Sequence, residues 1–216
     1  MTAIAGRTVA TGTSAISDAL DRLGLPGSAR GIAPLADGQR MAGPAFTVRY
    51  VAAGSPPGTV GDYIDEVPAG AVVVLDNAGR TDCTVWGDIL TAVAAHRGLS
   101  GTAINGVCRD THRALSIGYP IYSCGRFMRT GKDRVEVAEV GSVVNLGDVQ
   151  VAAGDLVVGD DDGVVVVPAG RADEVLGLAA SISEREAAIL ADALGGGSLR
   201  GARDRYGYHE LQRREA

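Results

Sequence analysis

Aromatic side chains are scarce in this sequence, with one Trp, six Tyr and two Phe, or 4% of the 216 residues. Glycine is abundant by comparison, with 31 residues. A hydrophobic core must therefore be built from Val, Ala, Leu and Ile in tight, turn-rich packing. The content of 46% hydrophobic and 21% charged residues excludes a disordered chain. The length allows one large domain or two small ones.

Cysteine is also rare, and Cys83, Cys108 and Cys124 form no Cys-x-x-Cys pair. An odd number without that spacing indicates a reducing compartment rather than a disulfide framework. No apolar run approaches the roughly 18 residues that span a bilayer. The N-terminus has no basic start followed by an apolar stretch, so we expect no signal peptide. These features predict a cytoplasmic protein without a membrane partner.

Positive charge is in the minority, because 20 Lys and Arg face 26 Asp and Glu and the net charge is −6. A nucleic-acid binder needs a basic face that replaces phosphate counterions, so we expect no nucleic-acid partner.

Several common functional motifs are missing. Gly125 and Gly131 have five residues between them and Lys132 is followed by Asp, which does not match a phosphate-binding loop. The three histidines have no zinc spacing, and no Gly-x-Ser-x-Gly elbow is present. The run 160–163, Asp-Asp-Asp-Gly, favours a hairpin turn over a calcium loop. Cys108 is interpreted as a buried core residue rather than a nucleophile.

Hydrophobic periodicity predicts a compact α/β chain. We expect a first helix capped by Ser14 and ended by Gly24, and a closing helix over about 171–194. The middle of the chain alternates strand and helix, which is typical of a βαβ unit. Its predicted elements are strands at 46–51, 71–76 and 102–107 and helices at 88–98 and about 111–117. Short β segments between 135 and 168 follow, separated by Gly and Asp turns.

Two groups of polar residues fall where parallel sheets bind ligands. The run 87–90, Gly-Asp-Ile-Leu, stands at the start of the predicted helix 88–98. Arg109 and Asp110 stand at the carboxyl end of the strand 102–107, one residue beyond it. Because ligands bind outside the carboxyl ends of parallel strands, we expect these residues to meet at one sheet edge.

The chemistry of these residues suits a small α-keto acid bound to a metal ion. Asp110 offers a carboxylate to Mg²⁺, and Asp88 could hold one of the waters on the metal. Arg109 matches a substrate carboxylate, and the N–H groups of Ile89 and Leu90 at a helix start can bind an anionic oxygen. The alternative is that Asp88 only caps its helix and that Arg109 and Asp110 form a solvated ion pair.

The segment from Trp86 to Asp110 resembles the signature of the RraA-like family. That family includes the 4-hydroxy-4-methyl-2-oxoglutarate and 4-carboxy-4-hydroxy-2-oxoadipate aldolases, and its pattern is Gly-x-x-x-Asp, twenty residues, then Arg-Asp. Here 20 residues separate Asp88 from Arg109, and Thr84 replaces the leading Gly. Segments 16–25, 41–49 and 154–168 are also similar to the family.

The resemblance implies an α-β-β-α sandwich of the swivelling β/β/α type, with residues 1–216 as a single RraA-like domain. It also implies a homotrimer or homohexamer in which the C-terminal helix and tail, 171–216, pack on a neighbouring subunit. Glu186 of that neighbour, or Glu184 in its place, is then expected to hold the metal through a water molecule.

The implied activity is that of a class II aldolase that uses Mg²⁺ or Mn²⁺. It would cleave a 4-hydroxy-2-oxo dicarboxylate to pyruvate and decarboxylate oxaloacetate as a side activity. Arg109 and Asp88 are the predicted catalytic residues, and Gly87, Asp88, Ile89, Leu90 and Arg109 are predicted to bind the substrate. The general base stays unassigned from the sequence.

Two other functions are alternatives to the aldolase. Regulators in this family that bind ribonuclease E have another residue in place of the Asp after the Arg. The presence of Asp110 therefore favours the enzymes, and a non-catalytic regulator of ribonuclease E is the alternative. A methyltransferase of menaquinone synthesis would need a glycine-rich adenosylmethionine loop after a first strand, which the sequence lacks. Arg126, Arg129 and Lys132 are candidates for a distal substrate carboxylate or are surface charges.

Overall fold

The computed structural model describes residues 2–211 of the chain. The helices are α1 (Thr2–Arg22), α2 (Asp88–His96), α3 (Thr111–Ile117), α4 (Ala172–Leu194) and α5 (Leu199–Arg205), with the 3-10 turns η1 (Asp62–Glu66), η2 (Ala169–Arg171) and η3 (Tyr208–Glu210). The strands are β1 (Ser28–Ala29), β2 (Ala33–Pro34), β3 (Met41–Ala52), β4 (Val72–Thr84), β5 (Gly101–Cys108), β6 (Ile121–Arg126), β7 (Val135–Val140), β8 (Val144–Leu146), β9 (Val149–Val151), β10 (Leu156–Asp160) and β11 (Gly163–Val167).

One large mixed sheet organises the chain, with the strand order β1-β11-β10-β3-β4-β5-β6-β2 and with β7 paired to β3. Strands β3, β4, β5 and β6 run parallel to one another, and α2 and α3 connect β4 to β5 and β5 to β6. This arrangement confirms the predicted βαβ unit. Strands β8 and β9 form a separate two-stranded hairpin.

The sheet curls over so that its two halves face each other. A methyl group built on Gly159 of β10 would lie 2.7 Å from the ring of Tyr122 on β6, although three strands separate β10 from β6 in the sheet. Successive side chains of a strand point to opposite faces of the sheet, so one strand supplies residues to the cores on both faces. Val74 of β4 joins the core between the halves, whereas Leu75 joins the core under α2 and α3.

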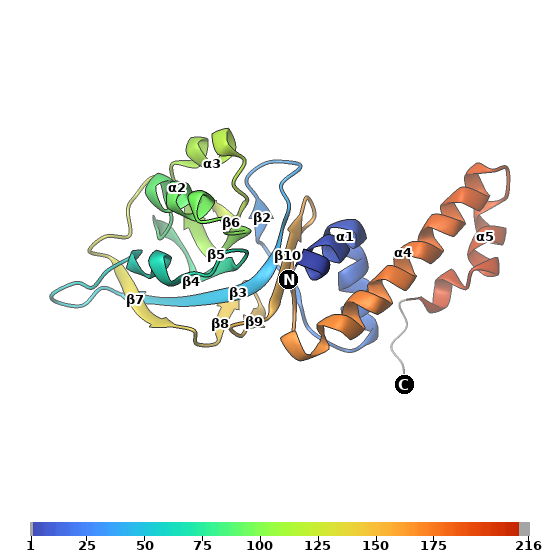
Figure 1. Cartoon of the computed structure of the whole chain (residues 1–216), viewed down its shortest axis with the longest axis horizontal. Helices are drawn as coiled ribbons and strands as arrows, with labels where there is room; N and C mark the ends of the chain where they lie inside the picture. Colours follow the sequence, from blue (N-terminus) through green and yellow to red (C-terminus); the bar gives the residue numbers. More distant parts are fainter. Residues whose placement is uncertain (1, 212–216) are drawn as a thin grey trace.

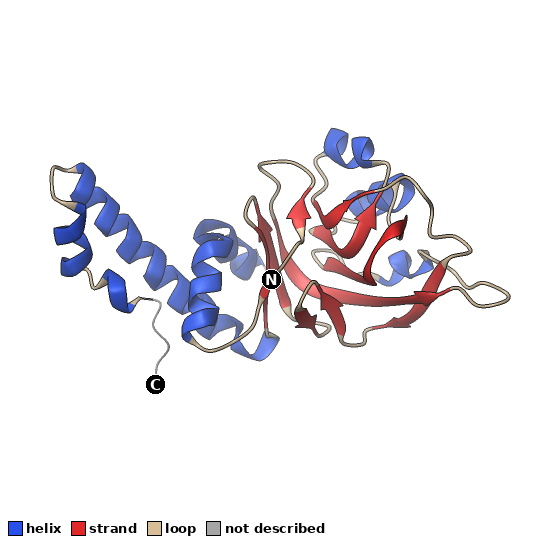
Figure 2. Cartoon of the chain, turned by 180° about the vertical axis from the view of Figure 1, so that it is seen from behind, coloured by secondary structure: helices blue, strands red, loops and turns tan. Residues whose placement is uncertain are grey.

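A third core lies between β10 and β11 and the helices α1 and α4. The layers are therefore helix, sheet, sheet and helix, with α2 and α3 at one end of the molecule and α1 and α4 at the other (Figures 1 and 2). This architecture confirms the predicted α-β-β-α sandwich.

The start of the first helix differs from the prediction. Helix α1 extends back to Thr2 and is interrupted at Gly12, whose φ of 73° is accessible mainly to glycine. After this kink, Thr13 donates its N–H and its hydroxyl to Asp160 of β10, at 2.8 Å and 2.5 Å. Asp160 thus provides the helix cap that was predicted for Ser14. The hydroxyl of Ser14 donates to Asp162 instead. Only the folded chain brings Asp160 to this helix.

Among the other elements, one turn was confirmed, one strand was confirmed with a different start, and two elements were not predicted. The turn at Asp161 and Asp162 joins β10 to β11 as an antiparallel hairpin, as predicted. Strand β3 begins five residues before the predicted 46–51, and β6 and α5 were missed by the periodicity. Strand β6, with the sequence Ile-Tyr-Ser-Cys-Gly-Arg, has neither a regular apolar alternation nor an unbroken apolar run to reveal it.

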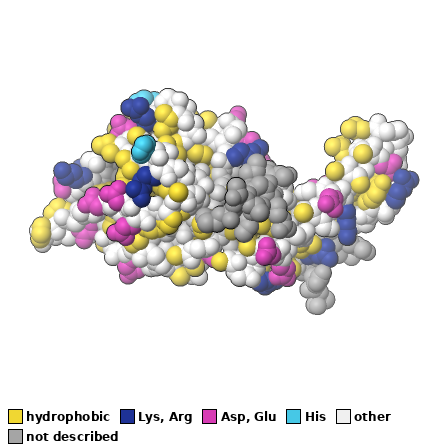
Figure 3. Space-filling view, viewed as in Figure 1, with side chains coloured by type: hydrophobic (Ala, Val, Ile, Leu, Met, Phe, Trp, Pro, Cys, Tyr) yellow, Lys and Arg dark blue, Asp and Glu magenta, His cyan; other side chains and the backbone are white. Residues whose placement is uncertain are grey.

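The first half of α4 packs within its own chain, where Val175, Leu176, Ala179 and Ile182 are buried beside α1. Farther along, α4 and α5 project as an arm with exposed Leu190, Leu194 and Leu199 (Figures 1 and 3). The contact of residues 171–216 with a neighbouring subunit stays a prediction, and residues 212–216 lie outside the described part. Within residues 2–211, no helix combines the length and apolarity needed to cross a membrane.

Candidate functional site

A pocket of about 620 Å³ opens beside the carboxyl end of the parallel strands. Its walls come from the loop 58–61, from η1, from the segment 84–90 at the start of α2, and from Arg109, Thr130 and Lys132. The predicted substrate-binding residues Gly87, Asp88, Ile89, Leu90 and Arg109 all line it. The structure therefore brings together the two sequence groups that the strand-edge rule placed in one site.

Arg109 and Asp110 form an ion pair where β5 ends. The Nε of Arg109 lies 3.3 Å from the Oδ2 of Asp110, and the two side chains are 38% and 36% exposed. The N–H of Arg109 donates to the carbonyl of Trp86 at 3.0 Å, which ties this turn to the start of α2. Asp110 has a left-handed backbone with φ 54° and ψ 34°, which aspartate tolerates better than most residues. Its carboxylate makes no capping bond to α3.

Gly87 lets the backbone before α2 approach this ion pair closely. A methyl group built on Gly87 would lie 2.9 Å from Oδ2 of Asp110 and 3.3 Å from Nε of Arg109. The φ of Gly87 is −146°, so its backbone is open to any residue and space alone requires glycine here. The backbone at Gly87 is therefore packed directly against the side chains of Arg109 and Asp110.

Asp88 begins α2 and occupies one of the predicted anion-binding groups. Its Oδ1 accepts the N–H of Ile89 at 2.8 Å, so a substrate oxygen would have to replace Asp88 at that N–H. The start of the helix is held rigidly, because buried Trp86 donates to Thr91 at 2.9 Å and Thr91 donates to the carbonyl of Gly87 at 2.8 Å. The bond from Ile89 to Asp88 agrees with the alternative interpretation, in which Asp88 only stabilises the start of its helix. The N-cap residue itself is Gly87.

The donor set around Asp110 fits a magnesium ion that keeps most of its waters. In the described part of the chain, no group of three or more His, Cys, Asp or Glu could hold a metal ion. Mg²⁺ needs no such cage, since it often binds through one or two carboxylates. The carboxylate of Asp110 is partly exposed and forms an ion pair with Arg109. Asp88 lines the pocket, whereas Asp110 lies behind its lining and adjoins it through Arg109 and Gly87.

The two glutamates predicted to hold the metal from a neighbouring subunit lie far from the pocket of their own chain. Glu184 and Glu186 are on α4, at the end of the molecule opposite α2 and α3 (Figures 1 and 2). Only a second copy of the chain could bring either residue to the pocket. Their role therefore stays a prediction.

The structure separates the three cations that were candidates for a distal carboxylate. Arg126 donates to the carbonyl of Leu35 at 2.6 Å, and the guanidinium of Arg129 lies 5.8 Å from the ring of Phe127. Neither lines the pocket, whereas Lys132 does. Lys132 is therefore the candidate that the geometry retains.

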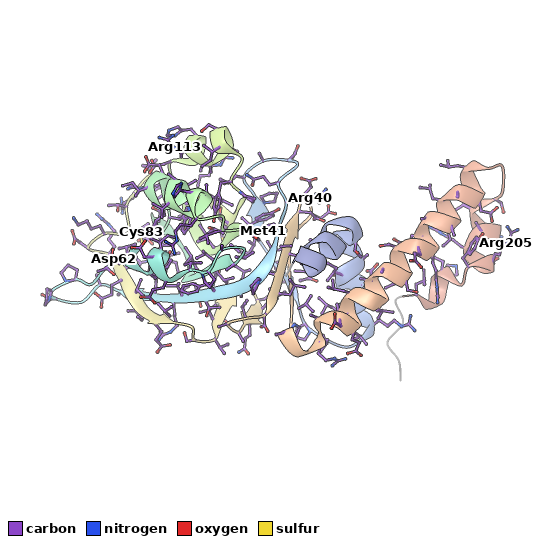
Figure 4. The ribbon with its side chains drawn as sticks, viewed as in Figure 1. Arg40, Met41, Asp62, Cys83, Arg113 and Arg205 are labelled. Atoms are coloured by element: carbon purple, nitrogen blue, oxygen red, sulfur yellow. The ribbon has the colours of Figure 1, made fainter. Side chains whose placement is uncertain are left out.

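Sequence reasoning missed the contribution of η1 and the loop before it. Asp62 and Asp65 line the pocket, and Figure 4 shows Asp62 on the side of the molecule that carries the parallel strands. No motif spacing links these residues to residues 87–110. Cys108 is fully buried, and burial raises the pKa of its thiol, which agrees with the predicted core role.

The fold and the pocket define an α/β sandwich protein with a polar pocket at the carboxyl edge of its parallel strands. The chain belongs to the RraA-like family, because the family model described as Aldolase/RraA matches residues 13–166. It is 34% identical over 76% of its length to a Halalkalibacterium halodurans protein provisionally named 4-hydroxy-4-methyl-2-oxoglutarate aldolase, and it covers 76% of that protein.

Solved structures agree with this family and fold. The chain is 39% identical to an uncharacterized Pseudomonas syringae protein, with a TM-score of 0.87 and coverage of 94% of this chain and 98% of that one. It is 27% identical to Streptomyces coelicolor RraAS2, described as an unusual member of the RNase ES inhibitor RraA family, with a TM-score of 0.76 and coverage of 85% and 93%. The chain spans only 32% of a longer relative, Legionella pneumophila DlpA, to which it is 37% identical over 90% of its own length.

Proposed function

We propose that this chain is a divalent-metal-dependent lyase that releases pyruvate from 4-hydroxy-4-methyl-2-oxoglutarate or a related 4-hydroxy-2-oxo dicarboxylate, with oxaloacetate decarboxylation as a side activity. The proposal rests on the close approach of Gly87 to Arg109 and Asp110, which sets a guanidinium and a carboxylate against the start of α2. A solvated surface pair would not require a glycine packed against it.

Arg109 has the main role in the proposed reaction. Its planar guanidinium would bind the C1 carboxylate and the neighbouring keto oxygen of the substrate. When the C3–C4 bond breaks, the electron pair moves into the pyruvate enolate, and negative charge develops on the former keto oxygen. Stabilising charge that appears only in the transition state is usually the largest catalytic contribution.

The metal would be held directly by Asp110, and through water by Asp88 and by Glu186 of a second copy. When bound, Mg²⁺ or Mn²⁺ supplies a Lewis acid for the keto oxygen. Asp88 would turn away from the N–H of Ile89 and free that N–H for a substrate oxygen. Its carboxylate would accept the proton of the C4 hydroxyl through a water molecule and return a proton to C3 of the enolate to give pyruvate. The N–H groups of Ile89 and Leu90 then face the carboxylate end of the substrate.

Lys132 is the proposed partner of the distal carboxylate. The pocket also contains the carboxylates of Asp62, Asp65 and Asp88, and the whole chain carries a net charge of −6. A dianionic substrate would be repelled unless local cations compensate. Arg109 and Lys132 are the cations that line the pocket among the described residues.

A lactate-dehydrogenase-coupled pyruvate assay tests the proposal. We expect pyruvate from 4-hydroxy-4-methyl-2-oxoglutarate and from oxaloacetate with Mg²⁺, loss of activity with EDTA, and recovery when Mg²⁺ is restored. Borohydride with pyruvate should trap no covalent adduct, because the proposed reaction uses no lysine Schiff base. Activity that survives EDTA, or a borohydride adduct, contradicts the mechanism. Absence of turnover together with binding to ribonuclease E and no calorimetric response to Mg²⁺ would favour the regulatory alternative.

A further inference from the structure

The loop that leads into η1 forms part of the pocket but has little packing of its own. It connects β3 to η1 and projects at one end of the molecule, next to β7 (Figure 1). Residues 54–59 are all exposed, so no buried side chain from this stretch anchors it to the core. The last part of the loop, 58–61, nevertheless lines the pocket.

A single carboxylate bridges the two sides of this loop. Oε2 of Glu136, on β7, accepts the N–H of Gly54 at 2.9 Å and the N–H of Gly58 at 2.6 Å. Both residues are glycines, and a methyl group on Gly58 would lie 3.2 Å from Oε2 and 3.3 Å from Cβ of Glu136. The pKa of Glu136 is lowered by the N–H groups of Gly54 and then of Gly58, so the bridge is made by an anion.

The bridge continues directly into the pocket wall. The N–H of Val137 donates to the carbonyl of Thr59 at 2.9 Å, and the hydroxyl of Tyr50 donates to the carbonyl of Val60 at 2.7 Å. A methyl group on Gly61 would meet the side chain of Leu90 at 3.1 Å. The loop therefore reaches from Glu136 to the first turn of α2, which carries the proposed substrate-binding N–H groups.

We infer that Glu136 is a positioning residue, which holds the loop 54–61 against β7 so that residues 58–61 form the pocket wall beside Leu90. This inference rests on the proposed function, because the pocket is taken to be the substrate site. Glu136 does not line the pocket and is assigned no contact with the substrate. It acts through the backbone of the loop.

The test compares Glu136→Ala, Glu136→Gln and Glu139→Ala. Glu139 is the matched control, because it lies on the same strand, is exposed and forms an ion pair with Arg49 at 2.7 Å without bonding to the loop. We expect Glu136→Ala to raise KM for oxaloacetate about tenfold with kcat changed by less than about threefold. Glu136→Gln keeps an acceptor oxygen and should stay within about threefold of the wild-type KM.

Amide hydrogen exchange of residues 53–62 supplies a readout that does not depend on activity. Exchange should accelerate in Glu136→Ala and not in Glu139→Ala, while both keep the same melting temperature. Gly58→Ala, which crowds the carboxylate, should shift KM and exchange in the same direction as Glu136→Ala.

Unchanged exchange in Glu136→Ala would refute the bridge. Faster exchange with an unchanged KM would refute the positioning of the pocket. If the wild type turns over none of the keto acids, the proposed function fails, whereas the exchange comparison still decides whether Glu136 holds the loop.

Discussion

Replacing Gly87 by alanine is the sharpest single test of the proposed site. The new methyl group would lie 2.9 Å from Oδ2 of Asp110, whereas ordinary contact begins at 3.4 Å. The carboxylate must therefore move by about 0.5 Å, and Nε of Arg109, at 3.3 Å, by less. Misplacement by about 1 Å can cost on the order of 10² in rate, so we expect activity to fall between about tenfold and a hundredfold.

The same substitution should leave the fold intact. The backbone of Gly87 is extended, and the crowded atoms are the ends of flexible side chains. Alanine at this helix cap should cost about 1 kcal/mol or less, and the melting temperature should fall by about 2–4 °C.

Coupled pyruvate release from oxaloacetate with Mg²⁺, together with thermal unfolding, measures both effects of Gly87→Ala. Gly170→Ala is the matched control, because a methyl group there meets nothing within 4 Å and the position is remote from the pocket. Wild-type activity in Gly87→Ala would show that Arg109 and Asp110 are only a solvated ion pair.

Three further predictions follow from named contacts. Arg109→Ala should lower kcat/KM for oxaloacetate by on the order of 10² without unfolding the protein, and retained activity would remove Arg109 from the mechanism. Lys132→Gln should raise KM for 4-hydroxy-4-methyl-2-oxoglutarate but leave the affinity for pyruvate, which has no distal carboxylate, unchanged; equal effects on both ligands would contradict this role. Burial alone would raise the pKa of Asp160, but hydrogen bonds from Thr13 and Asp162 and the charge of Arg40 outweigh it, so the pKa is lowered in the folded state. The stabilisation is present above the unfolded pKa of about 3.9 and is lost as the pH falls through the folded value. Urea unfolding at pH 6 and pH 3 should show this loss in the wild type and much less of it in Asp160→Asn.

Several features of the fold were accessible from local patterns. Apolar runs and their spacing located β4, α2, β5, α3 and most of α4, because secondary structure imposes its own period on buried positions. The strand-edge rule then placed Arg109 and Asp110 beside Gly87, and the short distances from Gly87 to both side chains agree. Strand β6 was not predicted because its mixed sequence has no regular alternation, and α5 was not predicted because its short, charged sequence has no apolar periodicity.

The sequence by itself determined the order of the elements and the chemistry available at the end of β5, because both depend on residues that are neighbours in the chain. The tertiary structure decided which distant groups meet. It put Asp160 at the kink of α1, beside Thr13, which is 147 residues away in the chain. It also packed Gly87 against Asp110 and joined Glu136 to glycines about 80 residues earlier. Such contacts arise only when the sheet curls and its loops pack together, and no local period or spacing encodes them.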